Sequence, residues 1–506
     1  MDGGIMSHLA GTLATYREQA IEEYRNNPLI AALPDIYSER DATVAMLVRP
    51  KFDPAERQLP AEQRWHLLAR LKHVVVPRPK YYEIERTVSR LIRAGYVMRN
   101  PLQADTWRRV YHANTHTEGR SRISSSSDQL MAADSKATIV GLSGIGKTTA
   151  IDAVLRTYPD QVVRHELYHG SRLPITQIVW LKVTCPENGS ISSFCREFAR
   201  QLDHALAIDK YERMYSRSKL TRDELEGMMR QHSATYFLGL LVIDEIQRLD
   251  LAKTQGAAPL LDFIQDLREQ LKVPTVLVGT YKAIRLFKRE LKDARRASES
   301  GLIDIEVPSS HDDADWVKFV RRLWTYQWTQ KPTELDEELF YTFYDLTQGI
   351  TDILVILFKL AQQRAMLDGS ETLTVECVRA TYNEQLVLLH PAIDALRSNT
   401  DESLTKFEDL LPPSRSVIER ATATSLAANI DARLDELMGV RSHEMATPIS
   451  PEDTRKSGKR RPQPELHEND LRSAAQSDDV YGTLKRAGAI ADITLFGEAL
   501  PSADPE

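Results

Sequence analysis

The sequence predicts an α/β fold, a doubly wound parallel sheet with a helical region before it and an all-helical region after it. The first observation is a set of short apolar runs typical of buried parallel strands. They are "ATIVGL" (137–142), "QIVWLKVT" (177–184), "LLVIDEI" (240–246) and "PTVLVGT" (274–280). Helical stretches such as "TTAIDAVLRTY" lie between the runs, as in βαβ units. After about residue 310 amphipathic helices follow one another without strands, beginning with "DADWVKFVRRLWTYQW".

The bulk composition is that of a globular protein of two or three domains. The chain has 506 residues, 42% hydrophobic and 27% charged. The sequence contains no run of about 18 uncharged apolar residues, so we expect no membrane span. The N-terminus also lacks the pattern of a secretory signal. Only three cysteines occur, and none forms a C-x-x-C pair. We therefore expect a cytoplasmic protein without disulfides.

The charge is unevenly distributed along the chain. Residues 401–506 carry 13 Lys and Arg against 20 Asp and Glu, which accounts for the whole net charge of −7. The first 400 residues are therefore neutral. This lack of net charge gives no support to nucleic-acid binding. It does not exclude such binding either, because a local basic surface is enough.

The region before the sheet, residues 1–115, is expected to be a helical extension, joined to the sheet by a linker at 116–135. "TYREQAIEEYRNNPLIAALP" begins as an amphipathic pattern, which Pro28 and Pro34 end. "YYEIERTVSRLIRAGYVMRNP" predicts a helix with Gly95 as its C-terminal stop. The apolar face of this helix comprises Ile84, Val88, Leu91 and Ile92.

The remaining boundaries follow from the change in pattern. Residues 136–308 form the expected α/β core and 309–398 a helical lid, with three tryptophans at helical spacing in its interior: Trp316, Trp324 and Trp328. Residues 399–506 read as a partly disordered tail because "TPISPEDTRKSGKRRPQPELHEND" is polar and proline-rich. The last apolar stretch of the tail is either a docking peptide or unstructured.

"GLSGIGKTTA", Gly141 to Ala150, matches the phosphate-binding pattern G-x-x-x-x-G-K-[ST] between an expected strand and helix. Its backbone N–H groups would surround phosphates, Lys147 would reach the β- and γ-phosphates, and the Thr148 hydroxyl would bind Mg²⁺. The sequence therefore predicts ATP and Mg²⁺ as ligands. The predicted nucleotide-binding residues are Gly141, Gly144, Ile145, Gly146, Lys147, Thr148, Thr149 and Asp244.

A second acidic motif, "LLVIDEIQRL", supplies the predicted hydrolytic residues. Asp244 ends a buried strand, where its carboxylate can hold Mg²⁺ together with Thr148. Glu245 is expected to face the other way by strand alternation and to polarise the attacking water. Thr280, at the end of another strand, could contact the γ-phosphate or be a plain strand-end residue.

Two basic segments have alternative explanations. Arg295 and Arg296 could reach a neighbouring subunit's nucleotide as an arginine finger, or belong to a solvated basic helix face. "YERMYSRSKLTRDE" places Tyr211 and Tyr215 among four basic residues and could be either a nucleic-acid groove or an exposed loop. Those basic residues are Arg213, Arg217, Lys219 and Arg222.

The order of P-loop, "IDEIQ", strand ending in Thr, "RR" helix end and helical lid resembles the AAA+ ATPases. Within them, segments such as "SRLIRAGYVMRNP", "LKDARRA", "LTQGITDILVILFKLAQQRA" and "EQLVLLHPAIDALRS" resemble the TnsC proteins of cut-and-paste transposons, of which TniB is a shorter relative. The resemblance runs from about Tyr16 to about Arg397.

This resemblance implies a regulator of transposition rather than a transposase. It implies an ATP-bound ring or filament of identical subunits on double-stranded target DNA, linking a TnsD/TniQ-type target selector to the TnsA–TnsB transposase. It also implies a bacterial protein that is nucleoid-associated when it is bound to DNA. It also implies that Glu245, Thr280 and Arg295/Arg296 act in ATP hydrolysis. One departure is Asp352, where many AAA+ lids carry an arginine, so lid-to-phosphate coupling is expected to be weak or carried by another group. The alternative function is an oligomerising signalling scaffold that does not bind DNA.

Overall fold

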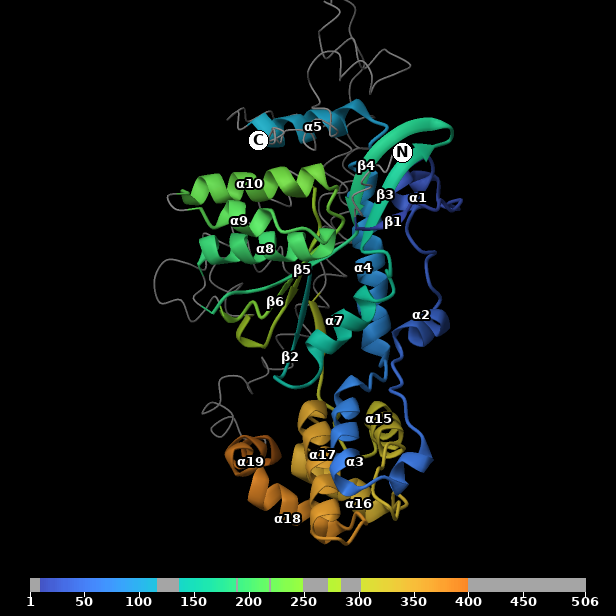
Figure 1. Cartoon of the computed structure of the whole chain (residues 1–506), viewed down its shortest axis with the longest axis vertical. Helices are drawn as coiled ribbons and strands as arrows, with labels where there is room; N and C mark the ends of the chain where they lie inside the picture. The colour runs from blue at the N-terminus through green and yellow to red at the C-terminus, as the bar shows by residue number, and fades with distance from the viewer. Residues whose placement is uncertain are drawn as a thin grey trace, which may run out of the picture.

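A five-stranded parallel sheet forms the centre of the computed structural model, which describes residues 10–115, 136–187, 190–217, 220–248, 272–283 and 302–398. The strand order is β5-β6-β7-β2-β8 (Figure 1). Their bounds are β2 (Lys136–Gly141), β5 (Leu181–Thr184), β6 (Leu241–Asp244), β7 (Thr275–Val278) and β8 (Leu302–Ile305). Every neighbouring pair in this sheet is parallel. This parallel sheet confirms the predicted α/β class.

Helices cover both faces of the sheet. On one face α8 (Ile191–Leu206), α9 (Tyr211–Tyr215) and α10 (Arg222–Thr235) pack against residues such as Ile243 and Leu277. On the other, α7 (Lys147–Leu155) and α4 (Pro79–Val97) pack against Val242 and Val276. The alternation of neighbouring strand residues between two apolar cores explains why the strands read as continuous apolar runs. α5 (Ala104–Thr115) packs near α10 through Ala113.

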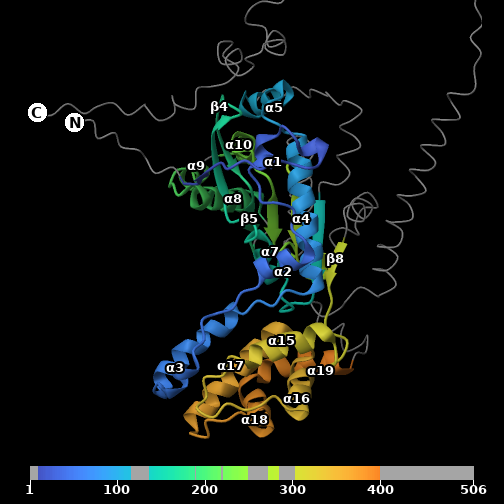
Figure 2. The same cartoon turned by 90° about the vertical axis from the view of Figure 1, so that its right-hand side faces the viewer.

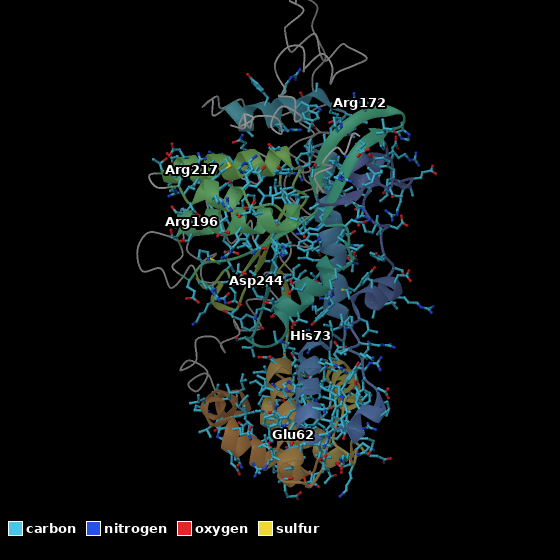
Figure 3. All side chains as sticks on the ribbon, in the orientation of Figure 1. Glu62, His73, Arg172, Arg196, Arg217 and Asp244 are labelled. Carbon is cyan, nitrogen blue, oxygen red and sulfur yellow. The ribbon has the colours of Figure 1, made fainter. Side chains whose placement is uncertain are left out.

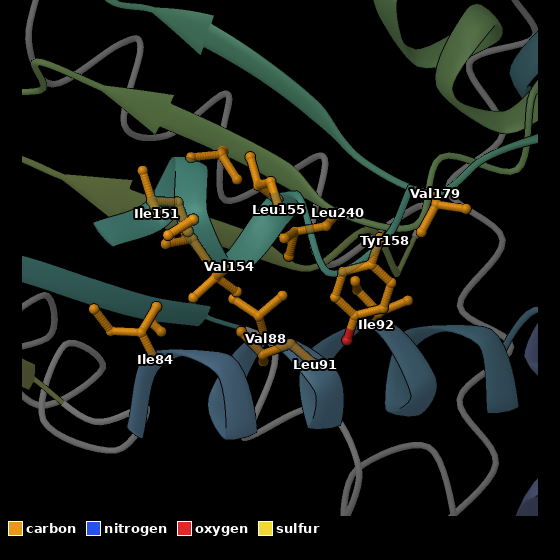
Figure 4. Packing of buried hydrophobic residues seen from close by; sticks show 14 of the residues in the cluster. Ile84, Val88, Leu91, Ile92, Ile151, Val154, Leu155, Tyr158, Val179 and Leu240 are labelled. Atoms are coloured by element: carbon orange, nitrogen blue, oxygen red, sulfur yellow. The ribbon is translucent and has the colours of Figure 1, made fainter. Parts of the chain in front are cut away.

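α4 confirms one expectation of the sequence and corrects another. Its predicted apolar face is buried against α7 (Figure 4). Gly95, however, lies inside the helix and does not end it. A Cβ on Gly95 would lie 2.7 Å from Cγ of Pro274, so the glycine permits close packing against the segment that leads into β7.

The amphipathic pattern after Thr15 does not form the expected helix. The described helical turns there are η1 (Glu22–Tyr24) and α1 (Pro28–Ala31). Pro28 begins α1 instead of ending a helix, because the Asn27 side chain caps it by accepting from the Leu29 N–H. Pro34 lies beyond α1.

A second sheet, which the sequence did not predict, joins β1 (Thr12–Leu13), β3 (Val162–Tyr168) and β4 (Ser171–Ile178) in the order β1-β3-β4. β3 and β4 form a hairpin whose turn residues His169 and Gly170 have φ of 48° and 82°. Positive φ at both central residues is the geometry of a tight hairpin turn. The run at 177–184 is therefore divided between the end of β4 and β5.

The lid contains α15 (Ala314–Trp324), α16 (Glu337–Thr347), α17 (Thr351–Leu367), α18 (Val375–Gln385), η4 (Val387–Leu389) and α19 (His390–Ser398). The three tryptophans are buried in its core, as predicted. They do not share one helix, however, because α15 ends at Trp324 and Trp328 lies beyond it. Among the described residues, no helix is both long and apolar enough for a membrane span.

Part of the N-terminal region packs into the lid instead of the α/β core. After α2 (Glu39–Met46), the chain forms η2 (Pro54–Gln58), α3 (Ala61–Leu67) and η3 (Leu68–His73) against the lid, then returns in α4 (Figures 1 and 2). Leu68 and Leu71 belong to the same apolar cluster as Trp316. We call residues 52–76 the strap.

Candidate nucleotide site

The loop between β2 and α7 has the shape that the glycine-rich motif predicts. Gly146 immediately precedes α7 with φ of 102°, in the left-handed region that glycine adopts with little strain. Lys147, the first residue of the helix, is buried, and its Nζ donates to the Leu142 carbonyl at 2.7 Å. A loop of this kind at a helix N-terminus offers N–H groups and positive potential to an anion. Phosphate binding is the chemistry that this geometry suits.

Thr148 and Asp244 meet at the carboxyl ends of β2 and β6, although β7 lies between these strands. The Thr148 hydroxyl donates to Oδ2 of Asp244 at 3.0 Å. Asp244 is buried at the end of the sheet nearer the lid (Figure 3). A hydroxyl and a carboxylate are oxygen ligands of the type Mg²⁺ prefers. The donor set therefore fits the predicted cation.

Glu245 lies beside Asp244, but strand alternation does not direct it. β6 ends at Asp244, and Glu245 has φ of 59°, a left-handed conformation that is uncommon for glutamate. The turn is stabilised by the Glu245 N–H, which donates to Oδ1 of Asp244 at 2.9 Å. Asp244 thus contacts Thr148 through one oxygen and fixes the turn through the other. The prediction that strand alternation sets the direction of Glu245 was therefore wrong, because the turn after β6 sets it.

Thr280 lies two residues beyond β7, next to the end of β2. Its N–H donates to Oε1 of Gln247 at 3.1 Å. The Thr280 hydroxyl is buried and finds no hydrogen-bond partner in the described part of the chain. A buried hydroxyl without a partner is unfavourable, so this atom suits a ligand or water at the site.

The lid touches the P-loop directly through the start of α17. The Asp352 N–H donates to the Gly144 carbonyl at 3.0 Å. The Thr351 hydroxyl lies 3.2 Å from the Gly144 carbonyl and 3.1 Å from that of Ile145. Burial raises the pKa of the Asp352 carboxyl above its usual value. The start of α17 therefore contacts the P-loop through a hydroxyl and a backbone amide, and this part of the helix has no arginine.

Two further predicted binding residues contribute less than expected through their side chains. The Ile145 side chain is fully buried in the core, and its N–H donates to the Leu142 carbonyl at 3.3 Å. Thr149 is exposed in the first turn of α7. Arg295 and Arg296 lie outside the described residues, as do Lys219, the linker at 116–135 and the tail at 399–506.

The predicted basic groove lacks its aromatic component. Tyr211 and Tyr215 are buried among α8, α9 and α10, so neither ring can stack on a base. Arg213 forms an ion pair with Asp209, and Arg222 forms one with Glu226 at 2.8 Å. Arg217 lies at the outer end of this helical layer, away from Asp244 (Figure 3).

Several residues at the site were not among those predicted. Gln247, Thr351 and Asp304 are the clearest, and Asp304 accepts from the Tyr281 hydroxyl at 2.8 Å. Burial is the main reason that the pKa of the Asp304 carboxyl rises to about 6. Gln247 could have been predicted from "IDEIQRL", because it is a polar residue shortly after an acidic pair. No local pattern, in contrast, marks Asp304 as a neighbour of Tyr281.

One comparison with known proteins agrees with this geometry, the match to a family model. Residues 133–287 match the family model described as "AAA domain". Among curated proteins there is no match to the chain.

Three solved structures are similar to this chain at low sequence identity. A Walker-type ATPase of Pyrococcus abyssi is 14% identical (TM-score 0.36), with 53% of this chain and 72% of that chain covered. Cdc6p from Pyrobaculum aerophilum is 17% identical (TM-score 0.36), with 49% and 59% covered. Drosophila ORC bound to DNA is 12% identical (TM-score 0.35), with 86% and 89% covered. The family match, the P-loop and the strand order together show that residues 133–287 carry an AAA domain, the P-loop fold of nucleotide-dependent ATPases.

Proposed function

We propose that this protein hydrolyses ATP to control its own assembly on target DNA during transposition. In this role it forms a ring or filament on double-stranded DNA. It links a TnsD/TniQ-type target selector to the TnsA–TnsB transposase. The sequence resemblance to TnsC proteins supports the partners, and the geometry of the nucleotide site supports the hydrolysis.

The observation that carries the ATPase proposal is the contact between Thr148 and Asp244 beside Glu245. Their hydroxyl and carboxylate lie 3.0 Å apart at the mouth of the P-loop. Glu245 is the adjacent residue and is half-buried, so a general base can lie next to the cation ligands. A protein that only bound a nucleotide would not need this second carboxylate.

Each residue has a defined task in this proposal. Lys147 holds the β- and γ-phosphates, and Thr148 with Asp244 holds Mg²⁺, which when bound neutralises charge on the phosphate oxygens. Glu245 takes a proton from the attacking water, and the Thr280 hydroxyl donates to the water or the γ-phosphate. Arg295 or Arg296 would complete the site of a neighbouring subunit.

The proposal is tested by assembly of the full chain on duplex DNA of arbitrary sequence. We expect ATP to produce oligomers on DNA, seen by electron microscopy and by sedimentation, while ADP does not. The logarithm of the DNA affinity should fall with the logarithm of the salt concentration, by about 0.9 per neutralised phosphate. ATP turnover measured in parallel reports the enzymatic part separately.

A DNA-free scaffold is the second candidate, and one observation favours it. The segment predicted as a nucleic-acid groove has buried tyrosines, and two of its arginines are already in ion pairs. ATP-dependent oligomers that form equally well without DNA, with a DNA affinity that ignores salt, would replace the first candidate with this one. Turnover without any oligomer would contradict both candidates.

A further inference from the structure

The side chain of Gln247 connects the two residues expected to act on the attacking water. Its Nε2 donates to Oε2 of Glu245 at 2.7 Å. Its Oε1 accepts from the Thr280 N–H at 3.1 Å. One amide group therefore joins the turn after β6 to the end of β7, which are neighbouring strands.

The chemistry of the two partners determines which way this amide points. The Thr280 N–H can only donate, and an ionised Glu245 carboxylate can only accept. A flipped amide would place its oxygen against the carboxylate and its NH₂ group against the N–H. The orientation in the structure is therefore the one that satisfies both neighbours.

The chain leaves room for this bridge at Gly279. A Cβ at Gly279 would lie 2.7 Å from Oε1 of Gln247 and 2.7 Å from Cγ2 of Ile246. Any other residue at position 279 would displace the amide from the Thr280 N–H. Glycine at position 279 thus leaves space for the Gln247 amide beside Thr280.

Other contacts fix the remaining freedom of Glu245. Its backbone is in the left-handed region, and Arg248 Nε lies 3.7 Å from its Oε2. The Arg248 guanidinium is itself anchored, since it donates to the Cys185 carbonyl at 3.2 Å. Gln247 and Arg248 both approach Oε2 of Glu245, so their contacts restrict the orientation of this carboxylate.

We propose that Gln247 is a positioning residue, which holds the base Glu245 in register with Thr280 so that both reach the same water. This inference rests on the proposed ATPase function. Gln247 takes no part in binding the phosphates or the cation. Its loss should therefore slow turnover without weakening the affinity for ATP.

The test is a comparison of Gln247→Met with the parent protein in steady-state ATP hydrolysis, with DNA present. Methionine has a similar length and no amide. We expect kcat to fall by about 10-fold or more, with KM and ATP affinity changed by less than about 2-fold. Gln247→Glu keeps an oxygen for the Thr280 N–H but replaces the donor that faces Glu245. Gln247→Glu should show the same fall in kcat. Agreement between the two variants would show that the fall does not come from a folding defect of Gln247→Met.

A double-mutant cycle separates positioning from general damage. In a Glu245→Gln background, adding Gln247→Met should leave the residual rate unchanged within about 2-fold, because the base it positions is gone. Gln161→Met is the matched control, since the Gln161 amide donates to the Trp180 carbonyl away from the site and should leave kcat at the parental value.

Three results would overturn the inference in distinguishable ways. A parent protein without ATP turnover contradicts the proposed function itself, and the inference with it. A parental kcat in Gln247→Met, with turnover present, contradicts the positioning role alone. An equal loss of rate in the Glu245→Gln background shows that Gln247 acts through something other than Glu245.

Discussion

Asp244 illustrates how a single side chain can organise this site. One of its carboxylate oxygens accepts from Thr148 and the other from the Glu245 N–H. The first contact ties β6 to the P-loop helix, and the second forces the turn that gives Glu245 its direction. One buried carboxylate thereby places the proposed cation ligand and the proposed base next to each other.

Lys147→Ala tests the phosphate site at the same scale. Removing the ammonium takes away a charge-assisted contact with the phosphates, so we expect ATP binding to weaken by about 10- to 100-fold. Titration calorimetry measures this affinity. The control is Lys182→Ala, which removes an ion pair between β5 and Asp152 of α7 and should leave the affinity unchanged. Equal ATP affinity in Lys147→Ala and the parent would contradict the P-loop assignment.

The start of α17 shows how one element can sense another. Its first two residues contact the carbonyls of Gly144 and Ile145, which lie in the loop that would hold the phosphates. A movement of the lid must therefore break hydrogen bonds to the P-loop. We expect this link to carry the lid-to-P-loop coupling that an arginine carries in many AAA+ lids.

Thr351→Val removes the hydroxyl of this link while keeping the shape of the side chain. We expect the free energy of unfolding to fall by about 1–2 kcal/mol, because the Ile145 carbonyl loses its partner in a buried setting. Hydrogen exchange should accelerate in the P-loop as well as in α17. Thr347→Val is the control, since the Thr347 hydroxyl bonds within α16 to Phe343 and does not reach the P-loop. Unchanged P-loop exchange in Thr351→Val would show that the lid and the loop are uncoupled.

The hairpin sheet contains a buried histidine that makes its stability depend on pH. His165 Nδ1 lies 3.0 Å from the Tyr16 hydroxyl, and its Nε2 lies 2.9 Å from Oε1 of Gln177. Burial lowers the pKa of the His165 imidazole from 6.5 to about 4. The folded protein therefore holds this ring neutral under conditions in which the unfolded chain has already bound a proton.

Acidification should therefore destabilise the protein through this residue. The stabilisation is complete above pH 6.5 and is lost as the pH falls towards about 4. It amounts to at most about 3 kcal/mol. Urea unfolding at pH 7 and pH 4.5 should show this loss in the parent but not in His165→Gln. His73→Gln, at an exposed site in the strap, should keep the parental pH dependence. An identical pH dependence in all three proteins would refute the assignment.

At the scale of the whole molecule, the lid is joined to the α/β core by more than one stretch of chain. β8 runs into α15, and the strap leaves the core after α2 and returns at α4. The strap is fastened by Arg64, only 1% exposed, which makes a bidentate ion pair with Glu371 and also donates to the Trp328 carbonyl. Trp328 in turn donates to Glu56 of the strap at 2.9 Å. We therefore expect the strap and the lid to move as one body.

Glu371→Gln tests this unit. It leaves the buried Arg64 guanidinium without its counter-charge, and we expect the free energy of unfolding to fall by about 2–4 kcal/mol. Hydrogen exchange should rise together in α3 and α15. Glu384→Gln breaks an exposed ion pair with Arg364 in the same lid and should leave the unfolding midpoint unchanged. Faster exchange confined to the lid would contradict a shared unit.

The sequence by itself determined those elements that depend on residues close together in the chain. The P-loop, the strand that ends in Asp244 and the apolar face of α4 depend on residue types at fixed spacing, and the structure places them as predicted. Periodicity identifies such elements because burial imposes it over a few consecutive turns or residues.

Only the tertiary structure decided which distant segments meet. Gly95 was predicted to end a helix because glycine is a common helix stop. In the structure, the glycine is instead explained by close packing against Pro274, which is far away in the sequence. The strap, the contact of Thr351 with the P-loop and the bridge of Gln247 likewise join residues that no local pattern relates. Partners of this kind are fixed by packing and hydrogen-bond satisfaction in three dimensions, and these forces leave no periodic trace in the sequence.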